Sequence, residues 1–335
     1  MPADPFEQLG GMAIAGAVVA GLAVPLGLVL AFVNRSFGGS FLPPWRAYAS
    51  RFQGAEILFL FGVYYTTMMV GPNVLDALGF YVAIYGPDEP ATDQFRVVRQ
   101  LWVSLFFAPV LLVAFQALPQ FLRTQSLKLE SRLWPGRVAF AVAAWWISTP
   151  VVIAIYFLTL LLVQLTGGPK QEHPLTETGP GATLFDQALF GVVVCVFTPL
   201  MEEILFRGLL VRWAAGRWYR PWILVAFAGV ALLMPSSSVE MALLGLAVAF
   251  GLGLYAIQRI GRSSPTFPVR TTSAIYGSAA LFGAVHAAIW PTPIPLFFLG
   301  LALGYVAIRS GSILGPVVMH GLFNAVSFAF LLRNG

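Results

Sequence analysis

The sequence predicts an all-α, polytopic membrane protein with about ten transmembrane helices. The chain of 335 residues is 58% hydrophobic and only 10% charged, and its mean hydropathy is +0.81. Soluble domains carry about 25% charged residues. About 20 apolar residues in a helix cross the hydrocarbon core of a bilayer, and the chain has runs of that length, such as residues 11–33, which hold no charged residue. These observations exclude an ordinary soluble enzyme.

Ten apolar segments are predicted to span the membrane. Residues 11–33 lack the basic flank of a secretory signal, so we interpret them as a retained helix. The segments 222–234 and 294–308 are short, which fits a helix with little tilt, a thinned bilayer or a re-entrant segment. The short stretch 74–85 either extends the second helix or lies at the interface. The predicted spans are residues 11–33, 55–72, 99–117, 138–165, 183–211, 222–234, 240–258, 273–290, 294–308 and 312–331.

The basic residues indicate topology. The net charge is +5 and the pI is about 9.6, but most Lys and Arg residues fall in alternate loops, the pattern of the positive-inside rule. The opposite loops carry acids, such as Asp88 and Glu177. We therefore expect both termini outside, contact with anionic membrane lipid, and no nucleic-acid partner. The basic loop residues are Arg35, Arg46, Arg51, Arg123, Lys128, Arg132, Arg137, Arg212, Arg217, Arg220, Arg259, Arg262, Arg270 and Arg309.

Ionisable residues within the spans are the candidates for function, because such a residue costs a few kcal/mol at the bilayer centre. Glu56 and Asp186 lie near the ends of predicted spans, which favours an interfacial position. The single cysteine, Cys195, can form neither an internal disulfide nor a zinc cluster, so we interpret it as a small packing residue. The remaining candidates lie on three later spans.

The first group is Glu202-Glu203-x-x-x-Arg207. Glu203 and Arg207 have the i,i+4 spacing of a helical ion pair with the acid N-terminal. Glu202 then points about 100° away around the helix, without an obvious local partner. A carboxylate of this kind is suited to act as a general base. The alternative is an inert network in which both glutamates share Arg207.

The second and third groups are Phe282-x-x-x-His286 and His320-x-x-x-Asn324. A single histidine in an apolar helix, such as His286, is more often a satisfied core residue than a catalyst. His320 and Asn324 share one helical face, and that face must look inward because asparagine is costly in lipid. Two donors on one face are able to stabilise a developing oxyanion.

The three motifs together resemble the CAAX prenyl protease and bacteriocin-processing family (CPBP, or Abi), whose signature they reproduce in order. Residues 295–316 also look like the segment that precedes the third motif in that family. The resemblance covers about residues 183–331. It implies a CPBP-like protease core in residues 183–335, while residues 1–182 are transmembrane helices of unassigned role. Motifs one and two lie farther apart than is usual in the family, and the surplus looks like an inserted helical hairpin at about 222–258.

The resemblance implies an intramembrane endopeptidase that hydrolyses a peptide bond of a membrane-associated, in some members prenylated, peptide or protein. By this resemblance, Glu202 would activate water with the help of His286. His320 and Asn324 would polarise the scissile carbonyl and hold the oxyanion. Arg207 would neutralise Glu203 and fix Glu202. Phe282 belongs to the supporting residues of the motif.

Several alternatives stay open at this level. A non-catalytic scaffold, immunity or regulatory protein would keep the same motifs, and a transporter also carries buried acids, although we see no two-fold hydropathy repeat. We expect a metal-independent glutamate mechanism without a cofactor. Glu202, His286 and His320 would otherwise form a two-histidine, one-carboxylate metal set, but the chain has no His-Glu-x-x-His helix. The expected location is a bacterial plasma membrane or the eukaryotic endoplasmic reticulum, with the active site toward the cytoplasm.

Overall fold

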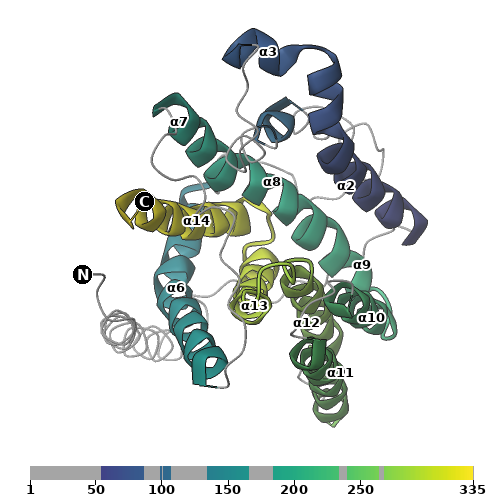
Figure 1. Ribbon diagram of the computed structural model, residues 1–335. Coiled ribbons are helices and arrows are strands. Elements are labelled where there is room, and N and C mark those ends of the chain that lie inside the picture. Colours follow the sequence, from purple (N-terminus) through teal and green to yellow (C-terminus); the bar gives the residue numbers. More distant parts are fainter. Residues whose placement is uncertain are drawn as a thin grey trace. The chain divides into compact units, whose positions relative to one another are not determined.

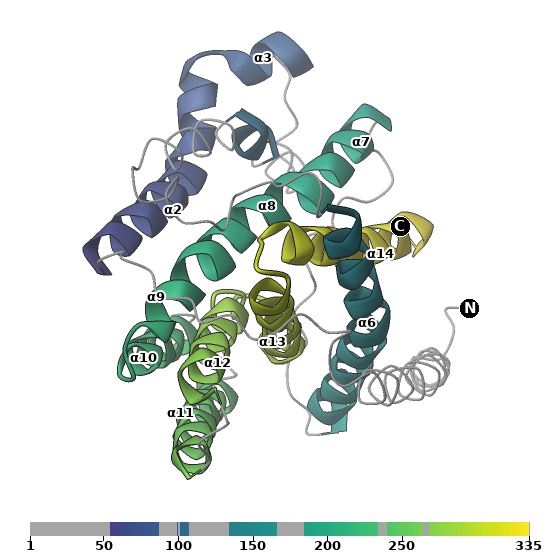
Figure 2. The same ribbon diagram turned by 180° about the vertical axis from the view of Figure 1, so that it is seen from behind.

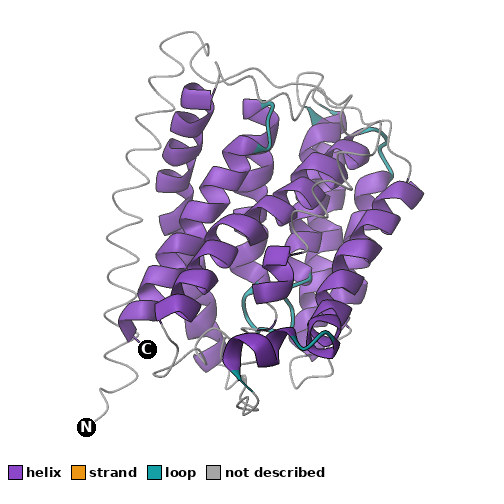
Figure 3. Cartoon of the chain, turned by 90° about the horizontal axis from the view of Figure 1, so that it is seen from above, coloured by secondary structure: helices purple, strands orange, loops and turns teal. Residues whose placement is uncertain are grey.

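The computed structural model describes residues 54–86, 99, 101–106, 134–165, 184–233, 240–263 and 268–334. Helices make up nearly all of these ranges, and no strand occurs within them (Figures 1 and 3). The all-α prediction is therefore confirmed for this part of the chain. The helices are α2 (Gly54–Ala77), α3 (Phe80–Tyr85), α6 (Trp134–Leu165), α7 (Leu184–Val192), the π-helix η4 (Val193–Phe197), α8 (Thr198–Glu203), the π-helix η5 (Ile204–Leu210), α9 (Val211–Ala215), α10 (Arg220–Leu233), α11 (Glu240–Arg262), α12 (Val269–Ala284), α13 (Pro293–Ser310) and α14 (Leu314–Asn334).

Five of the described helical segments are long and apolar enough to cross a membrane, which supports an integral membrane protein. Two shorter apolar helices, Arg220–Leu233 and Leu314–Ala329, accompany them. The predicted span 11–33 lies outside the described residues, as does most of 99–117, so the number ten stays a prediction. The five segments are Gly54–Ala77, Pro135–Leu165, Gln187–Ala215, Ala242–Arg262 and Pro293–Ser310.

Internal contacts divide the chain into two units, and both combine residues from before and after residue 183. Unit 1 contains α6, the helices from Phe206 to α13, and the start of α14 as far as Met319. Unit 2 contains α2, α3, residues 101–106, the helices from α7 to Leu205, and α14 from His320 onward. The helical run that carries motif one and the helix α14 therefore each contribute to both units.

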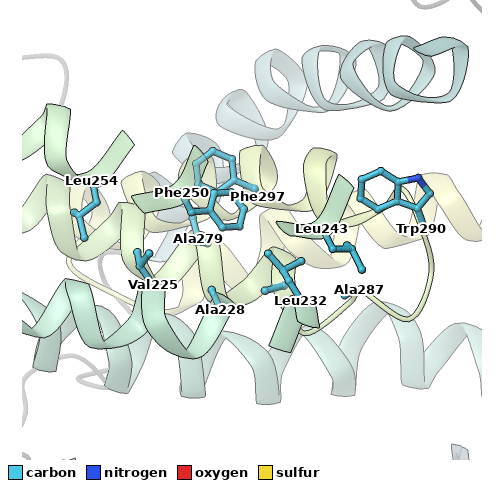
Figure 4. Packing of buried hydrophobic residues seen from close by; sticks show 12 residues of the cluster. Val225, Ala228, Leu232, Leu243, Phe250, Leu254, Ala279, Ala287, Trp290 and Phe297 are labelled. Carbon is cyan, nitrogen blue, oxygen red and sulfur yellow. The ribbon is translucent and has the colours of Figure 1, made fainter. Parts of the chain in front are cut away.

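Helix α12 contacts several other helices of unit 1. It packs against α9, α10, α11 and α13 (Figures 1 and 2). The core between these helices includes Val225, Leu254, Ala279 and Phe297 (Figure 4), and the rings of Phe250 and Phe297 lie 4.9 Å apart between centroids. The segment interpreted as an inserted hairpin forms α10 and α11, and both helices supply residues to this core.

Unit 2 has its own core, formed by α2, α3, residues 101–106, α7 and η4. Tyr81 and Val103 are fully buried in it, and Phe328 of α14 packs against it. At its edge, Arg99 forms an ion pair of 2.8 Å with Asp76 of α2, and the Tyr81 hydroxyl donates to the Arg99 carbonyl. The first part of the stretch 74–85 extends the second helix, since α2 ends at Ala77, and the rest forms the separate short helix α3. A position of α3 at the membrane interface stays a prediction.

Candidate active site

The two glutamates of motif one lie at the end of a short α-helix, α8, that is bounded by π-helices on both sides. A π-helix closes i→i+5 hydrogen bonds, and single π turns within α-helices are frequent at functional sites. The sequence-based geometry assumed one regular α-helix from Glu202 to Arg207. That assumption is wrong, because Arg207 lies in η5.

Glu203 is paired with a histidine of another helix. Its Oε1 lies 2.9 Å from Nδ1 of His320, and both side chains are buried, with 0% and 4% of their surface exposed. An ionised carboxylate can only accept, so Nδ1 of His320 is the donor in this contact. The spacing of the motifs did not predict this pair, since it depends on how α14 approaches α8.

Glu202 is the more open of the two glutamates. Its side chain is 15% exposed, and its Oε2 lies 3.8 Å from Nε2 of His320, beyond hydrogen-bond distance. The two ring nitrogens of His320 therefore face two different carboxylates. The expectation that Glu202 lacks a close partner on its own helix agrees with this arrangement, in which its charged neighbour comes from α14.

Asn324 faces the interior of unit 2, as its polarity in an apolar helix predicted. Its Nδ2 donates to the carbonyl of Val194 in η4 at 2.8 Å. This bond uses one of the two amide hydrogens, so it orients the side chain and leaves the second hydrogen as a donor.

Gly321 brings α14 close to η4. A Cβ atom at this position would lie 2.5 Å from the carbonyl oxygen of Cys195, which is backbone and unable to yield. Close helix approach through small residues is typical of membrane proteins. Motif reasoning missed Gly321, although a small residue directly after His320 is the signal that would have found it. The thiol of Cys195 is free, and the residue is half-buried.

Arg207 is anchored within unit 1, where it is 2% exposed. Its Nη2 donates to the Gly300 carbonyl at 3.2 Å, and its guanidinium carbon lies 4.5 Å from the ring centroid of Phe282. Phe282 also meets Phe206 edge to face. The motif-two phenylalanine thus serves as a cation–π platform for the motif-one arginine. The pairing of Arg207 with Glu203 stays a prediction.

His286 does not lie in the middle of a helix, so the predicted span 273–290 is wrong at its C-terminal end. Helix α12 runs from Val269 to Ala284, and His286 lies in the turns that follow. Its Nδ1 lies 2.8 Å from the Phe282 carbonyl, which can only accept, so Nδ1 carries the hydrogen. In the neutral ring Nε2 is then left as a proton acceptor. The residue is half-buried.

The candidate residues therefore fall into two sets, one in each unit. Unit 2 brings together Glu202, Glu203, His320 and Asn324. Unit 1 joins Arg207, Phe282 and His286 through ring contacts and a backbone hydrogen bond. Each set holds an atom suited to proton transfer, which is a carboxylate oxygen of Glu202 in unit 2 and Nε2 of His286 in unit 1.

Comparison with known protein families matches the region that carries the three motifs. The family model described as type II CAAX prenyl endopeptidase Rce1-like matches residues 184–264 and 254–326. Comparisons with curated proteins and with solved structures gave no match. The family match agrees with the resemblance of the motifs and leaves α2, α3 and α6 outside the matched range. Residues 184–326 of this membrane protein are thus similar to the Rce1-like family, which agrees with the resemblance of the CPBP motifs.

Proposed function

We propose that this chain is an intramembrane endopeptidase of the CAAX prenyl endopeptidase type. Glu202 acts as the general base that removes a proton from water as the water attacks the scissile carbonyl. The Nε2 atom of His286 assists this proton transfer. The amine that leaves when the tetrahedral intermediate collapses takes up the transferred proton.

The remaining motif residues stabilise the oxyanion and orient the catalytic side chains. The second amide hydrogen of Asn324 serves the tetrahedral oxyanion. The Nε2 atom of His320 does so in the imidazolium form, in which both ring nitrogens carry hydrogen. Glu203 holds His320 through Nδ1, and Arg207 is held on Phe282. Both contacts order side chains before the substrate arrives, which is how an active site keeps its catalytic groups in place.

One observation carries the proposal most directly. Of the adjacent glutamates, one is sealed against His320 and the other is partly exposed beside the same ring. An inert packing network would bury both. The match of residues 184–326 to the Rce1-like family supports protease activity in general, and the exposed carboxylate is the group that such activity needs.

The proposed substrate is a membrane-tethered peptide or protein, cleaved close to the cytoplasmic leaflet. A prenylated C-terminus is the substrate that the family description suggests, while other membrane-associated peptides fit a bacterial source. The mechanism is proposed to be independent of metal. Cytoplasmic placement follows from the basic loops, which the positive-inside rule puts on that side.

The test is cleavage by the purified full chain in liposomes. Labelled membrane-tethered peptides, including a farnesylated one, are incubated with the wild type and with Glu202→Gln, with and without a chelator. We expect cleavage that is lost in Glu202→Gln and retained in chelator.

Two outcomes would contradict this function. Loss of cleavage in chelator would replace the metal-free mechanism by a metal-dependent one. Absence of any cleavage by the folded wild type over the whole peptide set would favour a non-catalytic scaffold or regulatory role.

A further inference from the structure

Helix α2 presents one continuous face to the interior of its unit. Its buried residues Ile57, Leu60, Gly71 and Leu75 are 3, 11 and 4 residues apart, close to whole numbers of helical turns, and Met68 packs against the unit 2 core. Such spacing places side chains on one side of a helix. Tyr64 lies on this same face, four residues after Leu60 and four before Met68, so its phenol is directed inward rather than toward lipid.

This face of α2 is directed at the helical run that carries motif one. Leu75 and Met68 share the unit 2 core with Phe190 and Val193, and α2 runs beside α7 and α8 in the opposite direction (Figures 1 and 2). Because the two helical segments are antiparallel, the residues of α2 that precede Met68 lie beside the residues that follow Val193, in the direction of Glu202. In agreement, Glu202 lies near enough to act electrostatically on both Tyr64 and Tyr65, and of these two residues Tyr64 is the one on the inward face of α2, since Tyr65 is exposed.

The Tyr64 hydroxyl has an unused hydrogen-bond capacity. It makes no hydrogen bond to any residue that the structure describes, although its ring contacts Tyr65 edge to face. Tyr64 is half-buried, and within a membrane an unsatisfied polar group is expensive. A polar pair that is close but not in direct contact is commonly bridged by a water molecule.

We propose that Tyr64 is a further catalytic residue, whose hydroxyl donates a hydrogen bond to the water that Glu202 deprotonates. The water oxygen accepts from Tyr64 and donates to the Glu202 carboxylate, so its remaining lone pair is aimed at the scissile carbonyl. This inference rests on the proposed function. It gives α2, which lies outside the family-matched residues 184–326, a direct part in the chemistry.

The first test is the isosteric variant Tyr64→Phe in the liposome cleavage assay. We expect kcat to fall about 10- to 100-fold, the scale of a lost positioning or proton-transfer contact, with KM unchanged within about twofold because the hydroxyl does not bind the peptide. Tyr255→Phe is the matched control, since this phenol is 58% exposed on α11 in the other unit, and it should behave as the wild type.

A second readout does not depend on activity. Dicyclohexylcarbodiimide reacts with protonated carboxyl groups in apolar surroundings, and mass spectrometry measures its addition to Glu202, with Glu202→Gln confirming the site. A hydrogen-bonded water favours the charged carboxylate. Tyr64→Phe should therefore label faster than the wild type at neutral pH, whereas Tyr255→Phe should not.

The outcomes separate the two proposals. If the wild type cleaves and Tyr64→Phe matches it in both kcat and labelling, the role of Tyr64 is refuted while the protease function stands. The same holds if Tyr65→Phe alone lowers kcat. If the wild type cleaves nothing but Tyr64→Phe still accelerates labelling of Glu202, the contact is supported and the protease function is not.

Discussion

The two units hold their motif residues by different kinds of contact. In unit 2 Asn324 is held by a backbone carbonyl, but the central contacts join polar side chains to one another, with His320 placed between the two glutamates at 2.9 and 3.8 Å. In unit 1 Arg207 rests on the ring of Phe282 and donates to a backbone carbonyl, and His286 is tied to the carbonyl of Phe282. The motif residues of unit 1 are thus held by backbone carbonyls and an aromatic ring, whereas those of unit 2 also contact one another through polar side chains.

This difference determines how each unit should respond to substitution. When one partner of a buried hydrogen bond between side chains is removed, the other is left unsatisfied, and the loss is about 1–3 kcal/mol. A cation over a ring that also has a backbone acceptor loses only part of its environment when the ring is replaced. Unit 2 should therefore be the more sensitive, and the following variants test that order.

The largest effect is expected for Glu203→Ala. This change leaves the buried Nδ1 of His320 without its acceptor, and we expect the free energy of unfolding to fall by about 3 kcal/mol, the upper end of the cost of an unsatisfied buried donor. Cleavage should be lost as well, because His320 is no longer held. The measurement is unfolding in detergent, followed by tryptophan fluorescence. Glu203→Gln is the matched control, since its amide oxygen still accepts from Nδ1, and it should lose clearly less stability. Equal losses in the two variants would refute the importance of this hydrogen bond.

The next effect concerns the approach of α14 to η4. Gly321→Ala places a Cβ against the Cys195 carbonyl, and overpacking of this kind costs about 3 kcal/mol. Cleavage should fall more than stability suggests, because Gly321 adjoins His320. Gly251→Ala in α11 is the control: nothing lies within 4 Å of its Cβ position, and alanine is the better helix former. The same unfolding assay should show no loss for this variant, and a comparable loss in both would contradict the close approach.

A smaller effect is expected in unit 1 for Phe282→Leu. Leucine retains an apolar side chain but removes the ring under Arg207, so we expect a loss of about 2 kcal/mol, the value of a desolvated cation–π contact. Phe282→Tyr keeps the ring face and serves as the control in the same unfolding assay. A loss as large as that of Glu203→Ala would erase the proposed difference between the units.

Much of this arrangement could be predicted from the sequence, because it depends on local composition. The apolar runs predicted helices at 138–165 and 183–211, and the structure has them at Trp134–Leu165 and, with two π segments, from Leu184 to Ala215. The polarity of Asn324 predicted its inward orientation, which the bond to Val194 confirms. The motif spacing also identified the residues that the family match covers.

The rest depends on contacts between distant segments, which local patterns do not contain. Whether His320 meets Glu203 is decided by the path of α14. The π segments that flank α8 have no distinctive composition. The early end of α12 did have a signal, since Pro291 and Pro293 follow within nine residues of Ala284 and helices usually end before prolines. The apolar run continued to Trp290, however, and the prediction followed hydropathy instead.

The smallest effect is expected in the turns that follow His286. The Thr292 hydroxyl donates to the carbonyls of His286 and Ile289, so Thr292→Val removes these bonds at nearly constant volume. Because each neutral hydrogen bond contributes about 1 kcal/mol net, we expect a loss near that value in the unfolding assay. The carbonyl of His286 is not its reacting atom, so kcat should fall only slightly, and Thr292→Ser, which keeps the hydroxyl, should restore both quantities. If Thr292→Val instead abolished cleavage without loss of stability, the turn would be part of the catalytic machinery, and unit 1 would be as sensitive as unit 2.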